Sequence, residues 1–324
     1  MNPRPSLLVL DDHEGRIEAA PGTDRLRRLA DVRILRTALA DVPDSELADV
    51  SVLLAIRERT RLDAATLARF PALELILQTG GHAYHLDTEA ASRRGLVVAL
   101  QRRGTAGRAA VPELTFALMI SALRLMQRAD RALTHGQWPA LIGRCLFGRQ
   151  LGLLGVGRYG ARVARIAEAF GMRVVAWARP GGPIAAQRAD RVPRVGLDEL
   201  LATSDVVSVH LRLSEESRGL LDAERLRGCK PGAVLVNTAR GAIIDEAALV
   251  DVLREGPLAA AALDVFTEEP LPADSPLRSL PNVVLTPHVG WTVEEVFDEF
   301  ASIAADQLEQ YLDGQLDPSE LLDP

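Results

Sequence analysis

The sequence predicts an α/β protein made of two doubly wound parallel sheets. Short, nearly continuous apolar runs alternate with helical patterns along most of the 324 residues, which is typical of parallel strands buried on both faces. Eleven such runs are too many for one sheet, and a chain of this length is expected to form two domains. The expected strands are 6–10, 32–36, 50–55, 73–77, 96–100, 150–155, 173–177, 206–211, 233–237, 261–265 and 283–287.

The segments between these strands carry the apolar spacing of helices. Residues 161–170 and 245–256 are amphipathic examples, and residues 112–126 form the most apolar one. The glycine- and arginine-containing segment 99–112 interrupts the pattern, so we expect the domains to change there. A final helix over 293–313 is expected to cross back to the first domain. The expected division is therefore 1–103 plus 292–324 for a discontinuous first domain and 104–291 for the second.

Composition excludes several classes of function. The net charge of -7 and pI near 5.5 argue against a nucleic-acid-binding surface, which needs clustered basic charge. Cys145 and Cys229 form no paired motif, so neither a disulfide scaffold nor a cysteine zinc site is expected. The N-terminus predicts a strand rather than a signal peptide, and no apolar run reaches the ~20 residues that span a bilayer. A cytoplasmic protein without membrane or metal partners is expected.

A glycine-rich turn joins an expected strand to an expected helix. Gly155, Gly157 and Gly160 have the G-x-G-x-x-G spacing, and a second strand follows at 173–177. The first glycine permits the tight turn, the second lets a pyrophosphate approach the backbone, and the third allows close packing of helix on strand. The phosphates are expected at the N-terminus of the helix, where backbone N–H groups point outward. The pattern in this context predicts a dinucleotide-binding Rossmann unit.

Three motifs further along the chain carry a family resemblance. The motifs "VNTARGAIIDEAAL", "ALDVFTEEPLP" and "NVVLTPHVGW" occur in this order, within a likeness that runs from Glu113 to Glu294. Together they resemble the D-isomer-specific 2-hydroxyacid dehydrogenases. The resemblance implies a flavodoxin-like substrate domain and a Rossmann domain with the active site in the cleft between them. It also implies a homodimer held through the cofactor domain, and hydride transfer between a nicotinamide cofactor and a small 2-oxo or 2-hydroxy acid.

The resemblance assigns catalytic roles to Arg240, Glu269 and His288. An arginine after a strand can clamp a substrate carboxylate through two hydrogen bonds. A histidine can donate a proton in reduction and accept one in oxidation at neutral pH. The glutamate is expected to pair with the histidine and favour its charged form. The sequence therefore predicts a 2-oxo acid reductase in which the cofactor supplies the hydride and the protein supplies position and charge.

The remaining expected site residues follow from the glycine turn and from the resemblance, which also assigns Asp264 to the nicotinamide carboxamide. The expected cofactor contacts are Gly155, Val156, Gly157, Arg158, Tyr159, Gly160, Ala178, Arg179, His210, Thr238, Ala239 and Asp264. The expected substrate contacts are Arg57, Gly80, Gly81, Arg240 and Trp291.

The adenosine end of the cofactor site departs from the family pattern. Ala178, 23 residues beyond Gly155, occupies the position of the acid that normally binds the ribose hydroxyls. Arg179 follows it, and an arginine beside this position can accommodate a 2′-phosphate. Arg212, which replaces a usual proline, could also reach toward the adenosine end. These substitutions favour NADP over NAD.

The loop "QTGGHAYHLD" in the N-terminal part of the chain differs from the family pattern even more. Its glycine pair could bind a carboxylate through backbone amides, but His82, Tyr84 and His85 match no pattern that we can assign. Two histidines without a third ligand indicate a specificity loop rather than a metal site. Arg57 and Arg59 at the end of the third strand could reach an acidic group of the substrate or face solvent.

A second class of function stays open. Relatives of this fold act as dinucleotide-binding transcriptional corepressors, and Trp291 in "HVGW" resembles that branch. An intact Arg240, Glu269 and His288 does not separate the two classes. The absence of disordered tails and of a basic surface favours the enzyme.

Overall fold

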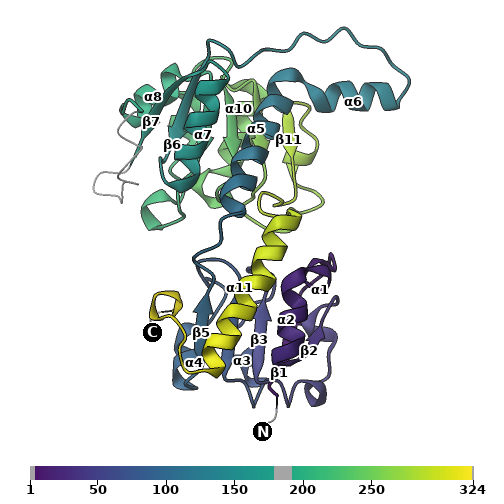
Figure 1. Cartoon of the computed structure of the whole chain (residues 1–324). Helices are drawn as coiled ribbons and strands as arrows, with labels where there is room; N and C mark the ends of the chain where they lie inside the picture. The colour runs from purple at the N-terminus through teal and green to yellow at the C-terminus, as the bar shows by residue number, and fades with distance from the viewer. Residues whose placement is uncertain (1–3, 179–191, 323–324) are drawn as a thin grey trace. The chain divides into compact units, whose positions relative to one another are not determined.

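The computed structural model describes residues 4–178 and 192–322, which divide into two compact units. Unit 1 comprises Met1–Gly107 and Thr292–Pro324, and unit 2 comprises Arg108–Trp291. Each unit contains one sheet in which every strand pairing is parallel (Figure 1). The predicted class, an α/β protein with two parallel sheets, is therefore confirmed.

The sheet of unit 1 has the order β2-β1-β3-β4-β5. Its strands are β1 (Ser6–Leu10), β2 (Asp31–Ile34), β3 (Val52–Ala55), β4 (Leu75–Gln78) and β5 (Val97–Leu100). The chain moves outward from β1 to β2 and then returns to the other side of β1 with β3. The loops after β1 and β3 thus flank a topological switch point, which is where open α/β sheets bind ligands.

Helices cover the sheet of unit 1. They are α1 (Arg16–Ala19), α2 (Pro21–Leu29), α3 (Ala64–Ala68), α4 (Thr88–Arg93) and α11 (Glu294–Leu312). The last helix, α11, packs against α1 and α2, while α3 and α4 contribute to a different apolar cluster with alternate residues of β1, β3 and β4. The side chains of Asp63 and Asp87 cap α3 and α4 by accepting a backbone N–H at the third helical position.

The sheet of unit 2 has the order β11-β10-β9-β8-β6-β7. Its strands are β6 (Gln150–Leu154), β7 (Arg173–Trp177), β8 (Val206–Val209), β9 (Val234–Asn237), β10 (Ala260–Leu263) and β11 (Val283–Leu285). All eleven described strands overlap the expected ones. The switch point of this sheet lies between β6 and β8, so the glycine turn after β6 occupies the ligand-binding position of the fold.

Alternate residues of these strands enter two different cores. Leu151 and Leu153 pack with α5 (Gly107–Arg124) and α7 (Arg158–Ala169), whereas Leu154 packs on the other face. That second face is covered by α8 (Leu197–Thr203), α9 (Ala223–Arg227) and α10 (Glu246–Glu255). Because both faces are buried, the strands are apolar throughout. Short 3-10 turns are formed by Leu39–Asp41, Asp44–Glu46, Glu215–Ser217, Gly241–Ile243, Pro276–Arg278 and Pro318–Glu320.

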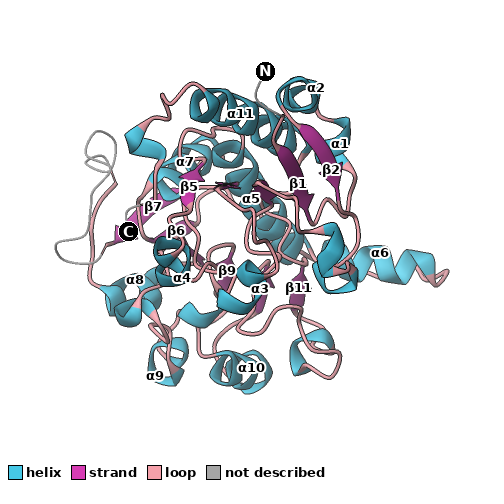
Figure 2. Cartoon of the chain, turned by 90° about the horizontal axis from the view of Figure 1, so that it is seen from below, coloured by secondary structure: helices cyan, strands magenta, loops and turns pink. Residues whose placement is uncertain are grey.

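The helix expected over 112–126 differs from the structure. It begins at Gly107 as α5 and contains Pro112, whose missing N–H removes only one hydrogen bond near the helix start. It ends before Leu125, whose φ of 57° breaks the pattern, and α6 (Met126–Thr134) continues at 67° to it. No single described helix is long and apolar enough to span a membrane. The bent pair passes that test together by length and composition, although eight of the 18 residues of α5 are buried in unit 2. In Figure 2, α6 projects from the rest of unit 2.

Candidate functional site

The three glycines of the turn after β6 each meet a different steric requirement. Gly155 has φ +96°, a conformation that L side chains rarely adopt. A Cβ on Gly160 would lie 2.2 Å from the carbonyl oxygen of Gly155, so only glycine lets α7 pack this closely. A Cβ on Gly157 would meet no described atom within 4 Å. The turn therefore leaves open space at the N-terminus of α7, and this arrangement fits the pyrophosphate of a dinucleotide.

This difference between Gly157 and Gly160 gives a matched pair of variants. We expect Gly160→Ala to lower the free energy of unfolding by about 1–3 kcal/mol, because the added methyl collides with backbone. We expect Gly157→Ala to leave stability unchanged and to weaken cofactor binding about tenfold, because the methyl occupies the space left for the phosphates. Urea unfolding and fluorescence titration with NADH and NADPH measure the two effects. Equal losses of stability would contradict this account of the turn.

His210 lies beside the turn, at the end of β8. Its carbonyl oxygen would be 2.9 Å from a Cβ on Gly155, and its backbone N–H donates to Leu154 at 2.8 Å. Its Nε2 lies 2.9 Å from the hydroxyl of Ser208. Burial lowers the pKa of His210 to about 4, so the ring is neutral near pH 7. His210 thus offers the cofactor region a neutral ring that Ser208 orients.

The other expected contacts around the turn differ in their surroundings. Val156 points into the core of unit 2, so only its backbone could face a ligand, whereas Arg158 and Tyr159 are exposed. Ala178 is half-buried and follows Trp177, whose carbonyl accepts the N–H of Gly155 at 2.9 Å. Arg179 lies outside the described residues.

A buried asparagine shapes the loop that carries Arg240. Asn237 ends β9, donates through Nδ2 to the carbonyl of Arg240 at 3.0 Å, and accepts the N–H of Ala239 at 3.0 Å. Thr238 lies between them, with its hydroxyl 3.0 Å from that of Thr115 on α5. The half-buried Arg240 donates to the carbonyl of Ala239 at 2.7 Å. Sequence reasoning missed Asn237, although an amide at the end of an otherwise apolar strand is a signal for such a role.

His288 and Glu269 form the closest pair of the site. The Nδ1 of His288 lies 2.6 Å from Oε2 of Glu269, and the other carboxylate oxygen accepts the N–H of Phe266 at 2.9 Å. Burial opposes ionisation of Glu269, but the hydrogen bond and charge of His288, the Phe266 amide and the charge of Arg240 lower the pKa of its carboxyl. Among the residues expected to be catalytic, Glu269 therefore pairs with His288 and lies within electrostatic reach of Arg240. Their roles stay predictions.

The loop of His288 is held by Asp264, which is 1% exposed. Asp264 Oδ1 accepts from the Thr286 hydroxyl at 2.6 Å and the Val289 N–H at 2.9 Å, and Oδ2 accepts from the Gly290 N–H at 2.9 Å. Burial raises the pKa of Asp264, although these hydrogen bonds oppose the shift. Bonds on both sides of His288 support its φ of 54°, a left-handed conformation that is uncommon for non-glycine residues. Asp264 thus orients the His288 loop, and its expected contact with a nicotinamide stays a prediction.

The expected substrate residues fall into two groups that belong to different units. In unit 1, Arg57 and Gly80 are in contact, because a Cβ on Gly80 would lie 2.0 Å from Nη1 of Arg57. Gly81 is exposed next to them. In unit 2, Arg240 lies near Glu269, and Trp291 is half-buried directly after the His288 loop. Among residues 4–178 and 192–322, no group of three histidine, cysteine or acidic side chains could hold a metal.

Comparison with known proteins gives consistent matches. The family described as "D-isomer specific 2-hydroxyacid dehydrogenase, NAD binding domain" matches residues 116–290. Glyoxylate reductase of Aeropyrum pernix is 39% identical over 275 residues, covering 80% of this chain and 79% of that protein. D-3-phosphoglycerate dehydrogenase of Mycobacterium bovis is 35% identical over 316 residues, covering 97% of this chain but only 58% of that protein. The crystal structure of the TT0316 protein from Thermus thermophilus superposes with a TM-score of 0.85 at 35% identity, covering 98% of this chain and all of that one.

Proposed function

Because the chain belongs to the D-isomer-specific 2-hydroxyacid dehydrogenase family, we propose that it reduces a small 2-oxo acid to the 2-hydroxy acid with a nicotinamide cofactor. The observation that carries the proposal is the His288–Glu269 pair at 2.6 Å, with Arg240 in electrostatic reach. The same unit holds a glycine turn that fits a dinucleotide. Neither the family match nor the relatives above supports a corepressor.

The proposed chemistry assigns one task to each of the three residues. When bound, the nicotinamide supplies the hydride that is added to C2 of the 2-oxo acid. Arg240 binds the substrate carboxylate through its guanidinium fork and polarises the neighbouring carbonyl. His288 donates the proton of Nε2 to the carbonyl oxygen, while Glu269 holds Nδ1–H and stabilises the charged ring before transfer. In oxidation His288 accepts the proton instead.

A panel of small 2-oxo acids tests this proposal. Glyoxylate, hydroxypyruvate, pyruvate and longer 2-oxo acids are mixed with purified protein and either NADPH or NADH. The proposal predicts oxidation of the reduced cofactor with at least one acid, matched by formation of the 2-hydroxy acid. Lack of turnover with every acid and both cofactors would refute it.

We also propose a preference for NADPH over NADH. Two features support the proposal within the described residues: Ala178 offers no carboxylate to the ribose hydroxyls, and Arg212 is exposed in the loop after β8. Arg179 is the residue that we expect to bind the 2′-phosphate. We expect the dissociation constant for NADPH to be at least about tenfold lower than that for NADH, or about 1.4 kcal/mol.

The same titration with two variants tests whether Arg179 causes the preference for NADPH. Arg179→Ala is expected to weaken NADPH binding and to leave NADH binding nearly unchanged. Arg218→Ala, an exposed arginine further along the loop after β8, is the control and should change neither constant. Equal weakening of both cofactors by Arg179→Ala would show that the arginine does not bind the phosphate.

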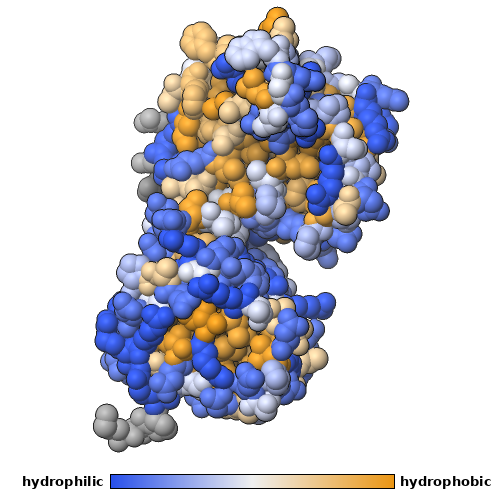
Figure 3. All heavy atoms as spheres, turned by 90° about the vertical axis from the view of Figure 1, so that its right-hand side faces the viewer, coloured by the Kyte–Doolittle hydropathy of each residue, from blue (hydrophilic) through white to orange (hydrophobic). Residues whose placement is uncertain are grey.

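We further propose that the protein forms a homodimer through unit 2. No residue of α6 is buried, and residues 135–140 after it are all exposed. Trp138 and Ile142 are 91% and 93% exposed. The apolar surface of this side of unit 2 is visible in Figure 3. The exposed large apolar side chains of this part of the chain are Met126, Leu133, Trp138, Ile142 and, further along, Phe147 and Phe170.

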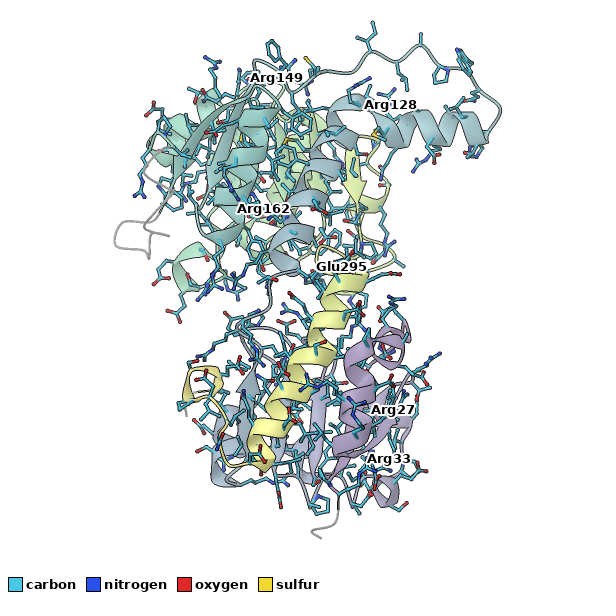
Figure 4. The ribbon with its side chains drawn as sticks, in the orientation of Figure 1. Arg27, Arg33, Arg128, Arg149, Arg162 and Glu295 are labelled. Atoms are coloured by element: carbon cyan, nitrogen blue, oxygen red, sulfur yellow. The ribbon has the colours of Figure 1, made fainter. Side chains whose placement is uncertain are left out.

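A second copy is the partner that fits this surface. Such a patch commonly marks a protein interface, and a two-fold dimer presents the same patch from both sides. Charged side chains occur on the same unit: Arg128 on α6, Arg149 before β6 and Arg162 on α7 are labelled in Figure 4. The exposed Asp130 of α6 gives this surface charges of both signs.

The dimer is tested by replacing two exposed side chains. Trp138→Ser with Ile142→Ser is expected to convert a dimer into a 35.0 kDa monomer in sedimentation equilibrium, because this removes the two most exposed side chains of the patch. The circular dichroism spectrum should not change, since neither side chain packs in the core. Leu312→Ser, 48% exposed on α11, is the control and should sediment as wild type. A monomeric wild type would contradict the proposal.

A further inference from the structure

A charged cluster lies at the carboxyl ends of β3 and β4 in unit 1, and we name it the Glu58 cluster. It consists of Arg57, Glu58, His82 and His85. Glu58 lies between two of the others: its Oε2 is 3.5 Å from Nε of Arg57, and its Oε1 is 3.0 Å from Nδ1 of His82. The charges of Glu58, His82 and Arg57 all act on His85. The carboxyl edge of a parallel sheet is where ligands of this fold class bind.

The backbone and the aromatic rings hold this cluster in place. Arg57 has φ +55°, and its N–H donates to the Thr79 hydroxyl at 2.7 Å. Its carbonyl accepts from Gln78 Nε2 at 3.0 Å. The ring of His82 stacks on that of Tyr84 with centroids 4.4 Å apart. An arginine in this uncommon conformation, fixed by buried side chains, is typical of a binding site.

The charges of the cluster largely compensate one another. Arg57 and Glu58 carry one charge of each sign, and Glu58 also faces His82. Burial lowers the pKa of His85, although the charge of Glu58 opposes the shift, so His85 is neutral near pH 7. The neighbouring Arg59 adds no unbalanced positive charge, because its guanidinium is paired with both carboxylate oxygens of Glu14. Among these five residues, little positive charge therefore remains beyond what Glu58 and Glu14 neutralise.

From this arrangement we propose that Glu58 is a specificity-determining residue that selects 2-oxo acids whose far end carries no negative charge. The inference rests on the proposed function and on the expected role of Arg57, Gly80 and Gly81 in substrate binding. A second carboxylate or a phosphate drawn toward Arg57 would meet the carboxylate of Glu58, and like charges at this range repel strongly. A hydroxyl group can instead donate to Glu58, and a short apolar end meets no charge of its own sign.

Two acids with the same number of carbons test the proposal. The ratio of kcat/KM for 2-oxobutyrate to that for oxaloacetate is measured for wild type and Glu58→Gln. Wild type is expected to favour the monoacid at least about tenfold, and Glu58→Gln is expected to lower the ratio about tenfold or more, because the opposing charge is lost. The ratio cancels any general loss of activity. A wild type that prefers oxaloacetate, or a ratio unchanged in Glu58→Gln, would overturn the inference.

Two further variants separate charge from shape. Glu58→Asp keeps the carboxylate and should keep the preference for the monoacid. Glu46→Gln removes an exposed carboxylate of unit 1, from the 3-10 turn Asp44–Glu46 that precedes β3, and it should leave the ratio at the wild-type value. A ratio lowered equally by Glu46→Gln would show that general charge, rather than Glu58, sets the preference.

Equilibrium binding separates failure of the inference from failure of the proposed function. Calorimetry with D-2-hydroxybutyrate and D-malate, in the presence of reduced cofactor, reports selection without turnover. Lack of turnover with every 2-oxo acid refutes the proposed function whatever the binding shows. Tighter binding of D-malate by wild type, binding of neither acid, or a preference that does not change in Glu58→Gln refutes the inference even when the enzyme is active.

Discussion

Replacing His288 with asparagine is expected to lower kcat/KM for 2-oxo acid reduction by about 10²–10⁴-fold, the usual contribution of a positioned general acid. Asparagine is chosen because His288 has φ 54°, and asparagine accepts this conformation better than other side chains do. The variant therefore removes the proton donor with little added backbone strain. Steady-state kinetics with the best acid of the panel measures the effect.

Cofactor binding provides the control for this variant. The dissociation constant for the preferred reduced cofactor should change less than about twofold, because the glycine turn lies on a different loop of unit 2. Glu269→Gln is expected to lower kcat by a smaller factor, since the ring loses its charged partner at 2.6 Å but keeps the proton donor. Glu268→Gln, the exposed neighbour, should have no effect. Retained turnover in His288→Asn would remove this residue from proton transfer.

Replacing Arg240 with lysine is expected to lower kcat/KM by about 100-fold or more. Lysine keeps the positive charge that acts on Glu269, but it cannot form two parallel hydrogen bonds to a carboxylate. The buried Asn237 should still hold the loop, because it bonds to the backbone of Ala239 and Arg240. The loss should appear in KM as well as in kcat, since the clamp acts on bound substrate and on the transition state.

The matched control for this prediction is Arg254→Lys. Arg254 is an exposed arginine of α10 in the same unit, and its replacement should leave kcat/KM unchanged. The melting temperatures of both variants should stay near that of wild type. An Arg240→Lys enzyme with kcat/KM within about threefold of wild type would contradict the carboxylate clamp.

Much of the fold was predictable because both faces of each sheet are buried. Continuous apolar runs such as those of β6 and β9 arise when alternate residues enter two cores, and this signal is local in the sequence. The break at Leu125 was not predictable. Leucine has no preference for positive φ, and the apolar pattern continues across it into Met126. The projecting α6 therefore became visible only in the structure.

For the candidate site, the sequence predicted which residues are involved but not how they contact one another. The family motifs indicated Arg240, Glu269 and His288, but the spacing along the chain gives no distance between their atoms. The supporting residues Asn237 and Asp264 act through backbone groups of neighbouring loops, and such partners depend on how strands align in the sheet. The pairing of Glu58 with His82 likewise requires β3 to lie beside β4. Contacts of this kind follow from tertiary structure.

Under the proposed function, a hydride is transferred to C2 of a 2-oxo acid while His288 supplies the proton. The most direct measurement uses reduced cofactor that carries deuterium at C4 of the nicotinamide on the transferable face, followed by mass and chiral analysis of the product. We expect one deuterium at C2 of the D-2-hydroxy acid, with formation suppressed in His288→Asn. A product without deuterium at C2, a product of L configuration, or no product at all would refute this transfer.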